Sequence, residues 1–187
     1  MNIFVLHENP IIAARMHCDK HVPKMCVEAA QMMASALRRH DSPDEQMPLP
    51  KAGTPYKGGY AHHPCTVWAG DNRQNFVWLA QHAEELCEEY RRRFGKIHSC
   101  HEPIIIMGNL ILLIPKTTKF RSDRITPFAL AMPDEYRPEP IDGEVVYHAY
   151  PEHAVKAYRR YYHSKQFAKW EKGTPAPDWW RGVEVKV

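Results

Sequence analysis

The sequence lacks any apolar run long enough to cross a bilayer. Its longest apolar stretch covers residues 104–114, is interrupted by Gly108 and Asn109, and stops at Pro115. A membrane-spanning helix needs about 20 consecutive apolar residues. The first six residues also lack the basic leader and the small-residue cleavage site of a secretory signal. We therefore expect neither a membrane protein nor a secreted one, and we predict a cytoplasmic location.

The cysteines lack the spacing of a disulfide framework. Their number is odd and they are scattered along the chain: Cys18, Cys26, Cys65, Cys87 and Cys100. This pattern is typical of free thiols in a reducing compartment. Paired metal ligands are lacking too, because neither these cysteines nor His98 and His101 show a spacing such as C-x-x-C with H-x-x-x-H. We expect no metal and no other cofactor.

No internal repeat, low-complexity tract or excess of one charge is present. The chain has 187 residues, 25% of them charged, and a net charge of +3 with histidine neutral. This length and composition suit one folded domain with a hydrophobic core. Twelve histidines add positive charge as the pH falls toward their ordinary pKa, which permits a polyanionic partner. We predict a single domain over residues 1–187.

The first half of the chain has a helix-forming composition. Residues 10–39 are rich in Ala, Met, Leu and Arg, and their apolar residues recur at helical spacing. Pro23 fits this pattern if Asp19 caps a second helix, because the first-turn N–H groups have no partner within a helix. Otherwise Pro23 kinks one long helix.

Two further helices are indicated by their starts and stops. Asp71 predicts the cap of a helix that runs to Phe94, before Gly95. Pro151 predicts the start of a last helix that runs to about Lys172. An extended tail over residues 173–187 follows it.

The remaining segments predict a short helix and a minor β component. Residues 126–133 open with Thr-Pro, which predicts a short helix, whereas residues 1–6 are a compact run of strand formers. Residues 104–114 suit either a hairpin or a buried helix, and we favour strands. Residues 40–60 carry prolines and glycines without an apolar period, which predicts a flexible loop. The fold class is mainly α: a single compact helical domain with a short N-terminal strand and that small hairpin.

Titratable side chains would share one helix face in residues 17–31. They recur at steps of four and three: His17, His21, Lys24, Glu28 and Gln31. Asp19 and Lys20 flank this stripe, so an acid, amines and imidazoles would gather in a small area. Such a set suits general acid–base or Schiff-base chemistry. On spacing alone, a solvated face with Lys24–Glu28 pairing is the simpler interpretation.

Other candidates come from the middle of the chain. His63 follows the predicted loop and would bring an imidazole to the stripe, although a histidine beside a proline is more often structural. The helix over residues 71–94 presents aromatic and polar groups, for which core packing is the alternative. The candidate substrate-binding residues in this part are Trp68, Asn75, Trp78 and His82.

The segment over residues 156–170 interleaves cations with aromatic residues. Cations neutralise phosphates, and aromatic faces stack on unpaired bases. An amphipathic helix whose aromatic residues lie in the core is the equally weighted alternative. The candidate nucleic-acid contacts are Tyr158, Arg159, Tyr162, Lys165, Lys169 and Trp170.

Five segments together carry a family resemblance. They are M-N-I-F-V-L (1–6), A-A-R-M-H-C-D-K-H-V-P-K-M-C-V-E-A-A-Q-M (13–32), H-P-C-x-x-W (63–68), I-T-P-F-A-L-A-M-P (125–133) and Y-R-R-Y-Y-H-S-K-Q-F-A-K-W (158–170). Through these segments, which touch most of the chain, the sequence resembles small phage-type proteins labelled pyrimidine-dimer DNA glycosylase. For a phage-encoded protein, the expected location is the host cytoplasm.

The resemblance implies excision of a damaged or modified base from DNA. A lyase step would use an amine nucleophile, and a carboxylate would stabilise the sugar cation. The well-known dimer glycosylases are compact helical proteins that use their N-terminal amine and end in an aromatic, basic segment.

This sequence departs from that pattern at its start. Asn2 is bulky, so we expect Met1 to be retained, and residues 1–6 are predicted to be a structural strand. Amine chemistry would then fall to Lys20 or Lys24. Pro23 also interrupts a position that we expect to be aliphatic in the family.

Three functions remain open at this point. The first is a DNA-acting, base-excising enzyme with the catalytic candidates His21, Lys24, Glu28, Lys20, Asp19 and His63. The second is a transferase that modifies a phage-type base or nucleotide. The third is a non-catalytic protein that binds nucleic acid or a host protein.

Overall fold

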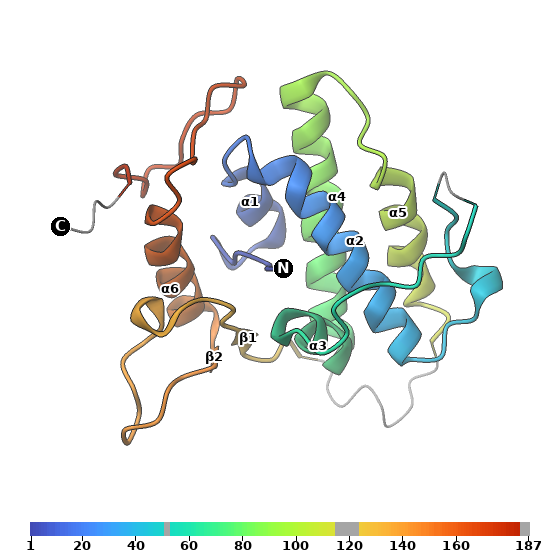
Figure 1. Cartoon of the computed structure of the whole chain (residues 1–187), viewed down its shortest axis with the longest axis horizontal. Coiled ribbons are helices and arrows are strands. Elements are labelled where there is room, and N and C mark those ends of the chain that lie inside the picture. The colour runs from blue at the N-terminus through green and yellow to red at the C-terminus, as the bar shows by residue number, and fades with distance from the viewer. Residues whose placement is uncertain (51–52, 115–123, 184–187) are drawn as a thin grey trace.

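A computed structural model describes residues 1–50, 53–114 and 124–183 (Figure 1). Two residues of the predicted loop (51–52) and the end of the predicted tail (184–187) lie outside the described residues. The described part has these helices: α1 (Pro10–Arg15), α2 (His21–Arg39), α3 (Pro64–Asp71), α4 (Arg73–Phe94), α5 (His101–Leu110) and α6 (Pro151–His163). Short 3-10 turns cover Asp44–Gln46 and Asp134–Tyr136, and the strands β1 (Phe128–Ala129) and β2 (His148–Ala149) pair antiparallel. The predicted mainly α fold is confirmed.

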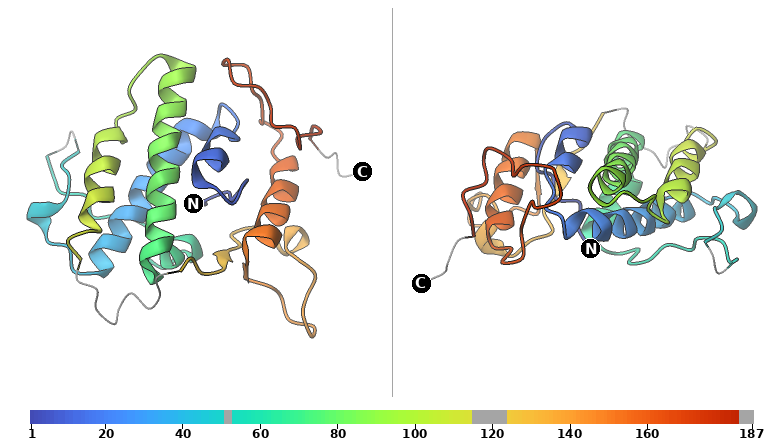
Figure 2. Two further views of the ribbon diagram at one scale, coloured as in Figure 1. Left: turned by 180° about the vertical axis from the view of Figure 1, so that it is seen from behind. Right: turned by 90° about the horizontal axis from the view of Figure 1, so that it is seen from above.

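The helices lie side by side around α2 and α4. Helix α2 packs against α3, α4 and α5, and α1 packs against α4. Helix α6 and the C-terminal segment lie on one side of this group and α5 on the other (Figures 1 and 2). No helix of the described residues is long and apolar enough to span a membrane.

The chain over residues 10–39 forms two helices, and Pro23 stands in the first turn of the second. A missing N–H has no cost there, so α2 needs no kink. The Asn9 side chain caps α1 by accepting from the N–H groups of Ile11 and Ile12. The expected cap by Asp19 is wrong, because its carboxylate accepts from Arg93 and from the backbone N–H of residue 171.

Helix α4 follows its predicted course, with a shifted start. Asn72, not Asp71, is its cap, and the Asn72 side chain accepts from the N–H of Gln74 at 2.7 Å. Asp71 instead ends the separate helix α3, which the sequence did not predict. Gly95 ends α4 in the left-handed region at φ +66°.

Residues 1–6 do not form the predicted strand. They are buried but have no strand partner, and Phe4 has a φ of +38° in a turn closed by the Leu6 N–H on the Phe4 carbonyl at 2.7 Å. The Asn2 side chain supports this turn by accepting from the N–H groups of Ile3 and Phe4. Packing among helices therefore replaces a strand ladder.

Three other predictions for local structure are wrong. Residues 101–110 form helix α5, with Ile104, Met107 and Leu110 on its buried face. Residues 126–133 contain strand β1 in place of a helix, since Phe128 pairs with Ala149. Helix α6 ends at residue 163, well before residue 172. The N–H of Ser164 closes its last turn by donating to the carbonyls of Tyr161 and Tyr162.

A buried guanidinium joins α1, α2 and α4. Arg93 on α4 donates at 2.9 Å to the carbonyl of Arg15, the last residue of α1, and at 2.7 Å to the carbonyl of His17, which follows that helix. It also donates to Glu89 at 2.7 Å and to Asp19 at 3.1 Å. Its side chain is wholly buried. The turn that leads into α2 is thus fixed from α4.

We predict that Arg93→Ala lowers the free energy of unfolding by about 3–5 kcal/mol, because it breaks the buried ion pair with Glu89 and leaves the carbonyls of Arg15 and His17 without this donor. Urea unfolding measures the change. The matched control is Arg91→Ala, since Arg91 pairs with Glu88 at the surface of the same helix and should change stability by less than about 1 kcal/mol. Equal losses in the two variants would contradict the role given to Arg93.

Candidate functional site

A carboxylate on α2 lies between two amino groups. The α-amino nitrogen of Met1 is 3.7 Å from Glu28 Oε2, and Lys24 Nζ is 3.4 Å from Glu28 Oε1. The Glu28 side chain is only 14% exposed, whereas that of Lys24 is 62% exposed. The predicted Lys24–Glu28 pairing is present, and the α-amino group is an addition that the sequence spacing did not show.

The start of the chain is held beside Glu28 by several contacts. The backbone N–H of Asn2 donates to Glu28 Oε2 at 2.8 Å, and the Asn2 amide donates to the Ala131 carbonyl at 2.6 Å. The Met1 side chain is 1% exposed, and its sulfur accepts from the Thr66 hydroxyl. The fold therefore adds the Met1 α-amino group to the two amines, Lys20 and Lys24, that the sequence predicted as candidates.

His63 lies on the same side of the molecule. Burial and the positive charge of the Met1 amino group lower its pKa, and Glu28 partly offsets that effect. The imidazole also caps α3, since His63 Nδ1 accepts from the N–H of Cys65 at 3.2 Å. Three of the predicted catalytic residues, Lys24, Glu28 and His63, are thus brought together by the fold.

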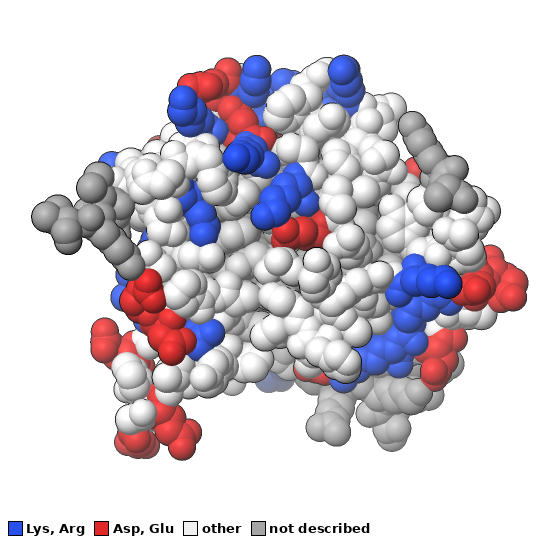
Figure 3. All heavy atoms as spheres, in the orientation of Figure 1, with Lys and Arg blue, Asp and Glu red and all other residues white. Residues whose placement is uncertain are grey.

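A groove of about 550 Å³ borders this cluster at His63. Its polar and aromatic walls include Arg137, Tyr147, His148 and Tyr161, and the Arg137 guanidinium stacks 4.4 Å above the Tyr147 ring. Sequence reasoning did not single out these residues as site residues, because no spacing relates them to α2. In Figure 3 a small acidic patch contacts a basic one near the middle of this face, within a wide uncharged area.

Lys165 supplies a further amine near the cluster. Its ammonium group lies 3.4 Å from the centre of the Tyr161 ring and 5.8 Å from that of Phe4. Burial lowers the pKa of Lys165 to about 8; Tyr136 opposes this shift and Lys24 adds to it. A larger fraction of this amine is neutral at neutral pH than is usual for lysine.

Three histidines of the predicted site lie in the core. His17 and His82 are fully buried with their rings 5.1 Å apart, and His21 bonds through Nδ1 to the Tyr162 hydroxyl at 2.8 Å. Burial is the main cause that lowers the pKa of His17 to about 4 and that of His21 to about 2, and it holds the pKa of His82 well below its usual value. These rings are neutral at neutral pH, so none of them carries the extra proton that a general acid would give up there.

Other predicted contact residues also pack inside the protein. The buried ones are Trp68, Asn75, Trp78, Tyr158 and Tyr162. Asn75 shows the pattern, since its amide donates to the Trp68 carbonyl and accepts from the N–H of Thr126. Asp19 serves Arg93, as described above. The structure therefore gives these side chains partners within the fold and does not bring them to the groove.

The remaining candidates are at or near the surface. Gln31 is half-buried on the same helix as Glu28. Lys20 lies 4.8 Å above the Phe167 ring, and Lys169 pairs with Glu171 at 3.6 Å. Arg159 and Trp170 are half-buried, and Arg159 donates to the Leu6 carbonyl at 2.9 Å.

The fold and this cluster define a helical protein with a carboxylate and amines gathered beside a groove. A family model described as pyrimidine dimer DNA glycosylase matches residues 1–102, which include α1 to α4 and the Glu28 cluster. The chain belongs to this family. No curated protein and no solved structure matches it.

The buried histidines predict acid sensitivity. Their pKa values are lowered in the folded chain, so below about pH 6.5 the unfolded chain binds more protons, and stability falls by up to about 1.4 kcal/mol per pH unit for each ring. His82→Phe should reduce this slope, because it removes one titrating ring. The fold should tolerate the change, since neither nitrogen of His82 has a hydrogen-bond partner among the described residues. Urea unfolding between about pH 7 and pH 5 measures it.

The exposed His153, changed to Phe, is the matched control and should leave the slope unchanged. If His82→Phe also leaves it unchanged, the neutral state assigned to His82 is contradicted.

Proposed function

We propose that the protein removes a damaged pyrimidine from DNA by cleaving its N-glycosylic bond, and then opens the resulting site through an amine-linked intermediate. The observation that carries this proposal is the partly buried Glu28 carboxylate with the Met1 α-amino group 3.7 Å away. A carboxylate and an amine are the two groups that such a reaction requires. Membership of the family named for this activity supports the substrate class.

In the proposed mechanism the amine attacks C1′ of the deoxyribose. The C1′–N bond breaks, its electron pair leaves with the base, and the base takes up a proton. Loss of the amine proton and opening of the sugar ring give an imine between C1′ and the amine. Removal of a proton from C2′ then forms a C2′–C3′ double bond as the 3′ phosphate leaves C3′, and water hydrolyses the imine to release the enzyme.

The Met1 α-amino group is the proposed nucleophile. It is fixed by the buried Met1 side chain and by the Asn2 contacts, whereas Lys24 is mostly exposed. Fixed geometry favours attack because less freedom is lost in the transition state.

Glu28 has two proposed roles. Its charge stabilises the positive sugar that forms as the base departs, and its small exposure strengthens that interaction. The carboxylate then accepts and returns the proton of the attacking amine. The groove beside His63 is the proposed place for a base turned out of the duplex, because its aromatic and guanidinium surfaces can stack on a base.

We predict that Glu28→Gln lowers the rate of glycosylic-bond cleavage in ultraviolet-irradiated DNA by about 10²–10⁴-fold, because the amide keeps the shape and removes the charge. Cleavage is measured as nicking of the irradiated strand on a denaturing gel, since the two bases of a pyrimidine dimer stay joined after one glycosylic bond is cut. Glu152→Gln on α6 is the control, since Glu152 pairs with Lys156 at the surface, and it should act like the native protein. A Glu28→Gln protein with unchanged activity would refute the role of Glu28.

We predict that borohydride traps a covalent adduct between the protein and irradiated DNA, and that peptide mapping places it on Met1. The intact mass is measured first to confirm that Met1 begins the mature chain. Lys24→Ala and Lys165→Ala should still form the adduct. An adduct that maps to Lys24 or Lys165 would assign the amine differently, and a heavier nucleoside without base release would instead indicate a transferase.

A further inference from the structure

Two thiols and an imidazole meet on the other side of α2 from Glu28. Cys26 on α2, Cys87 on α4 and His98 in the connection before α5 each offer one ligand atom, and these atoms all lie within 4.8 Å of one another. Both cysteines are buried and His98 is half-buried. Cys26 and Glu28 stand two residues apart, which is about 200° around the helix, so this cluster is separate from the proposed active site.

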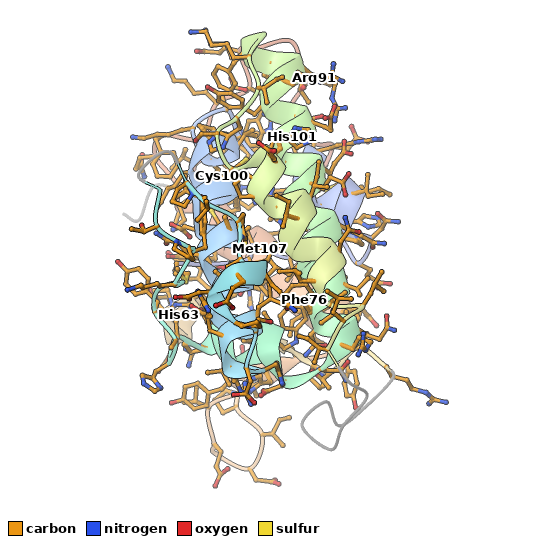
Figure 4. The ribbon with its side chains drawn as sticks, turned by 90° about the vertical axis from the view of Figure 1, so that its right-hand side faces the viewer. His63, Phe76, Arg91, Cys100, His101 and Met107 are labelled. Atoms are coloured by element: carbon orange, nitrogen blue, oxygen red, sulfur yellow. The ribbon has the colours of Figure 1, made fainter. Side chains whose placement is uncertain are left out.

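A third thiol lies near this cluster. Cys100 is the residue before α5 and is 6% exposed. It is close enough to Cys26 and Cys87 to interact with them electrostatically, and its sulfur is 3.9 Å from the Tyr56 hydroxyl. Figure 4 shows Cys100 and His101 at the start of α5, alongside α2.

The surroundings of His98 hold its ring in place. Its Nδ1 accepts from the N–H of Cys100 at 3.1 Å, the ring faces the carbonyl of Pro23, and Tyr90 packs edge-on against it at 4.8 Å. A metal-bound histidine ordinarily directs its second nitrogen at a carbonyl or a carboxylate, which fixes the ring. The Pro23 carbonyl can accept that bond here, and the nitrogen left for a metal is Nδ1, which would give up the bond from the Cys100 N–H.

We propose that Cys26, Cys87 and His98 bind one zinc ion, with Cys100 as the fourth ligand. A tetrahedral zinc site places two sulfurs about 3.8 Å apart and a sulfur and a nitrogen about 3.5 Å apart. The ligand atoms of Cys26, Cys87 and His98, all within 4.8 Å of one another, need to approach by only about 1 Å to reach this geometry, and the Cys100 sulfur must move further to join them. Thiolates with an imidazole are the donor set that selects zinc in preference to magnesium or calcium.

Zinc binding at this site would release protons from the thiols. The three thiols lose their protons to solvent as zinc binds, and the imidazole binds in its neutral form. Because all four positions are taken by protein, the ion would be structural and not catalytic. It would fasten α4 and the start of α5 to the face of α2 that is turned away from Glu28.

The experiment uses the full chain, purified without a metal-affinity step from cells grown with added zinc. Elemental analysis should find about one zinc per chain. After removal of zinc, added cobalt should give the intense visible bands of tetrahedral thiolate coordination. Cys26→Ser, Cys87→Ser and His98→Ala should each lose the bound metal, and a chelator should lower the melting temperature of the native protein.

Cys18→Ser is the matched control, because Cys18 is equally buried and is not part of the cluster, so it should keep the metal. Alkylation mapping on the native chain keeps the test valid if a variant fails to fold. Bound zinc should slow the alkylation of Cys26, Cys87 and Cys100 and leave the alkylation of Cys18 unchanged. Native protein that holds no zinc and gives no tetrahedral cobalt spectrum would overturn the proposal. So would Cys26→Ser protein with an unchanged zinc content. Neither result bears on base excision.

Discussion

The position of α2 depends on the buried guanidinium of Arg93. It meets the last carbonyls of α1, the Asp19 carboxylate at the entry to α2, and Glu89 on its own helix. Asp19 in turn accepts from the backbone N–H of Glu171, so the C-terminal segment is joined to the same point. A charge buried in this way is tolerated only with all of its donors in use. The orientation of the helix that carries Glu28 follows from this network.

In the Glu28 cluster (Met1, Lys24, Glu28 and His63), one amine is held in place and the other is exposed. Met1 is anchored through its own side chain and through Asn2, while Lys24 extends into solvent. In the proposed reaction the anchored Met1 amine loses little freedom when it attacks a sugar carbon, and the exposed Lys24 can bind a phosphate. His21 lies behind this face, neutral and bonded to Tyr162, where it supports the aromatic packing around Phe4.

Local signals in the sequence predicted local structure well and distant contacts poorly. The expected cap at residue 71 and the glycine at residue 95 predicted nearly the observed bounds of α4, and the four-residue step predicted the Lys24–Glu28 pair. The isoleucines over residues 104–106 favoured a strand, but packing against α4 made a helix. Met1 and Glu28 are 27 positions apart in the sequence, and Cys26, Cys87 and His98 come from separate elements. No spacing rule relates such residues, because the fold alone brings them together.

The segment between α2 and α3 passes close to α2 at Gly58. Its φ is +83°, and a Cβ placed there would lie 2.6 Å from the backbone nitrogen of Ser35. The next residue, Gly59, exchanges two hydrogen bonds with the Ser35 hydroxyl. Any side chain at position 58 would lift the crossing segment off the helix and carry His63, which follows it, away from the groove. The absence of a Cβ atom at position 58 therefore determines where His63 lies in the wall of the groove.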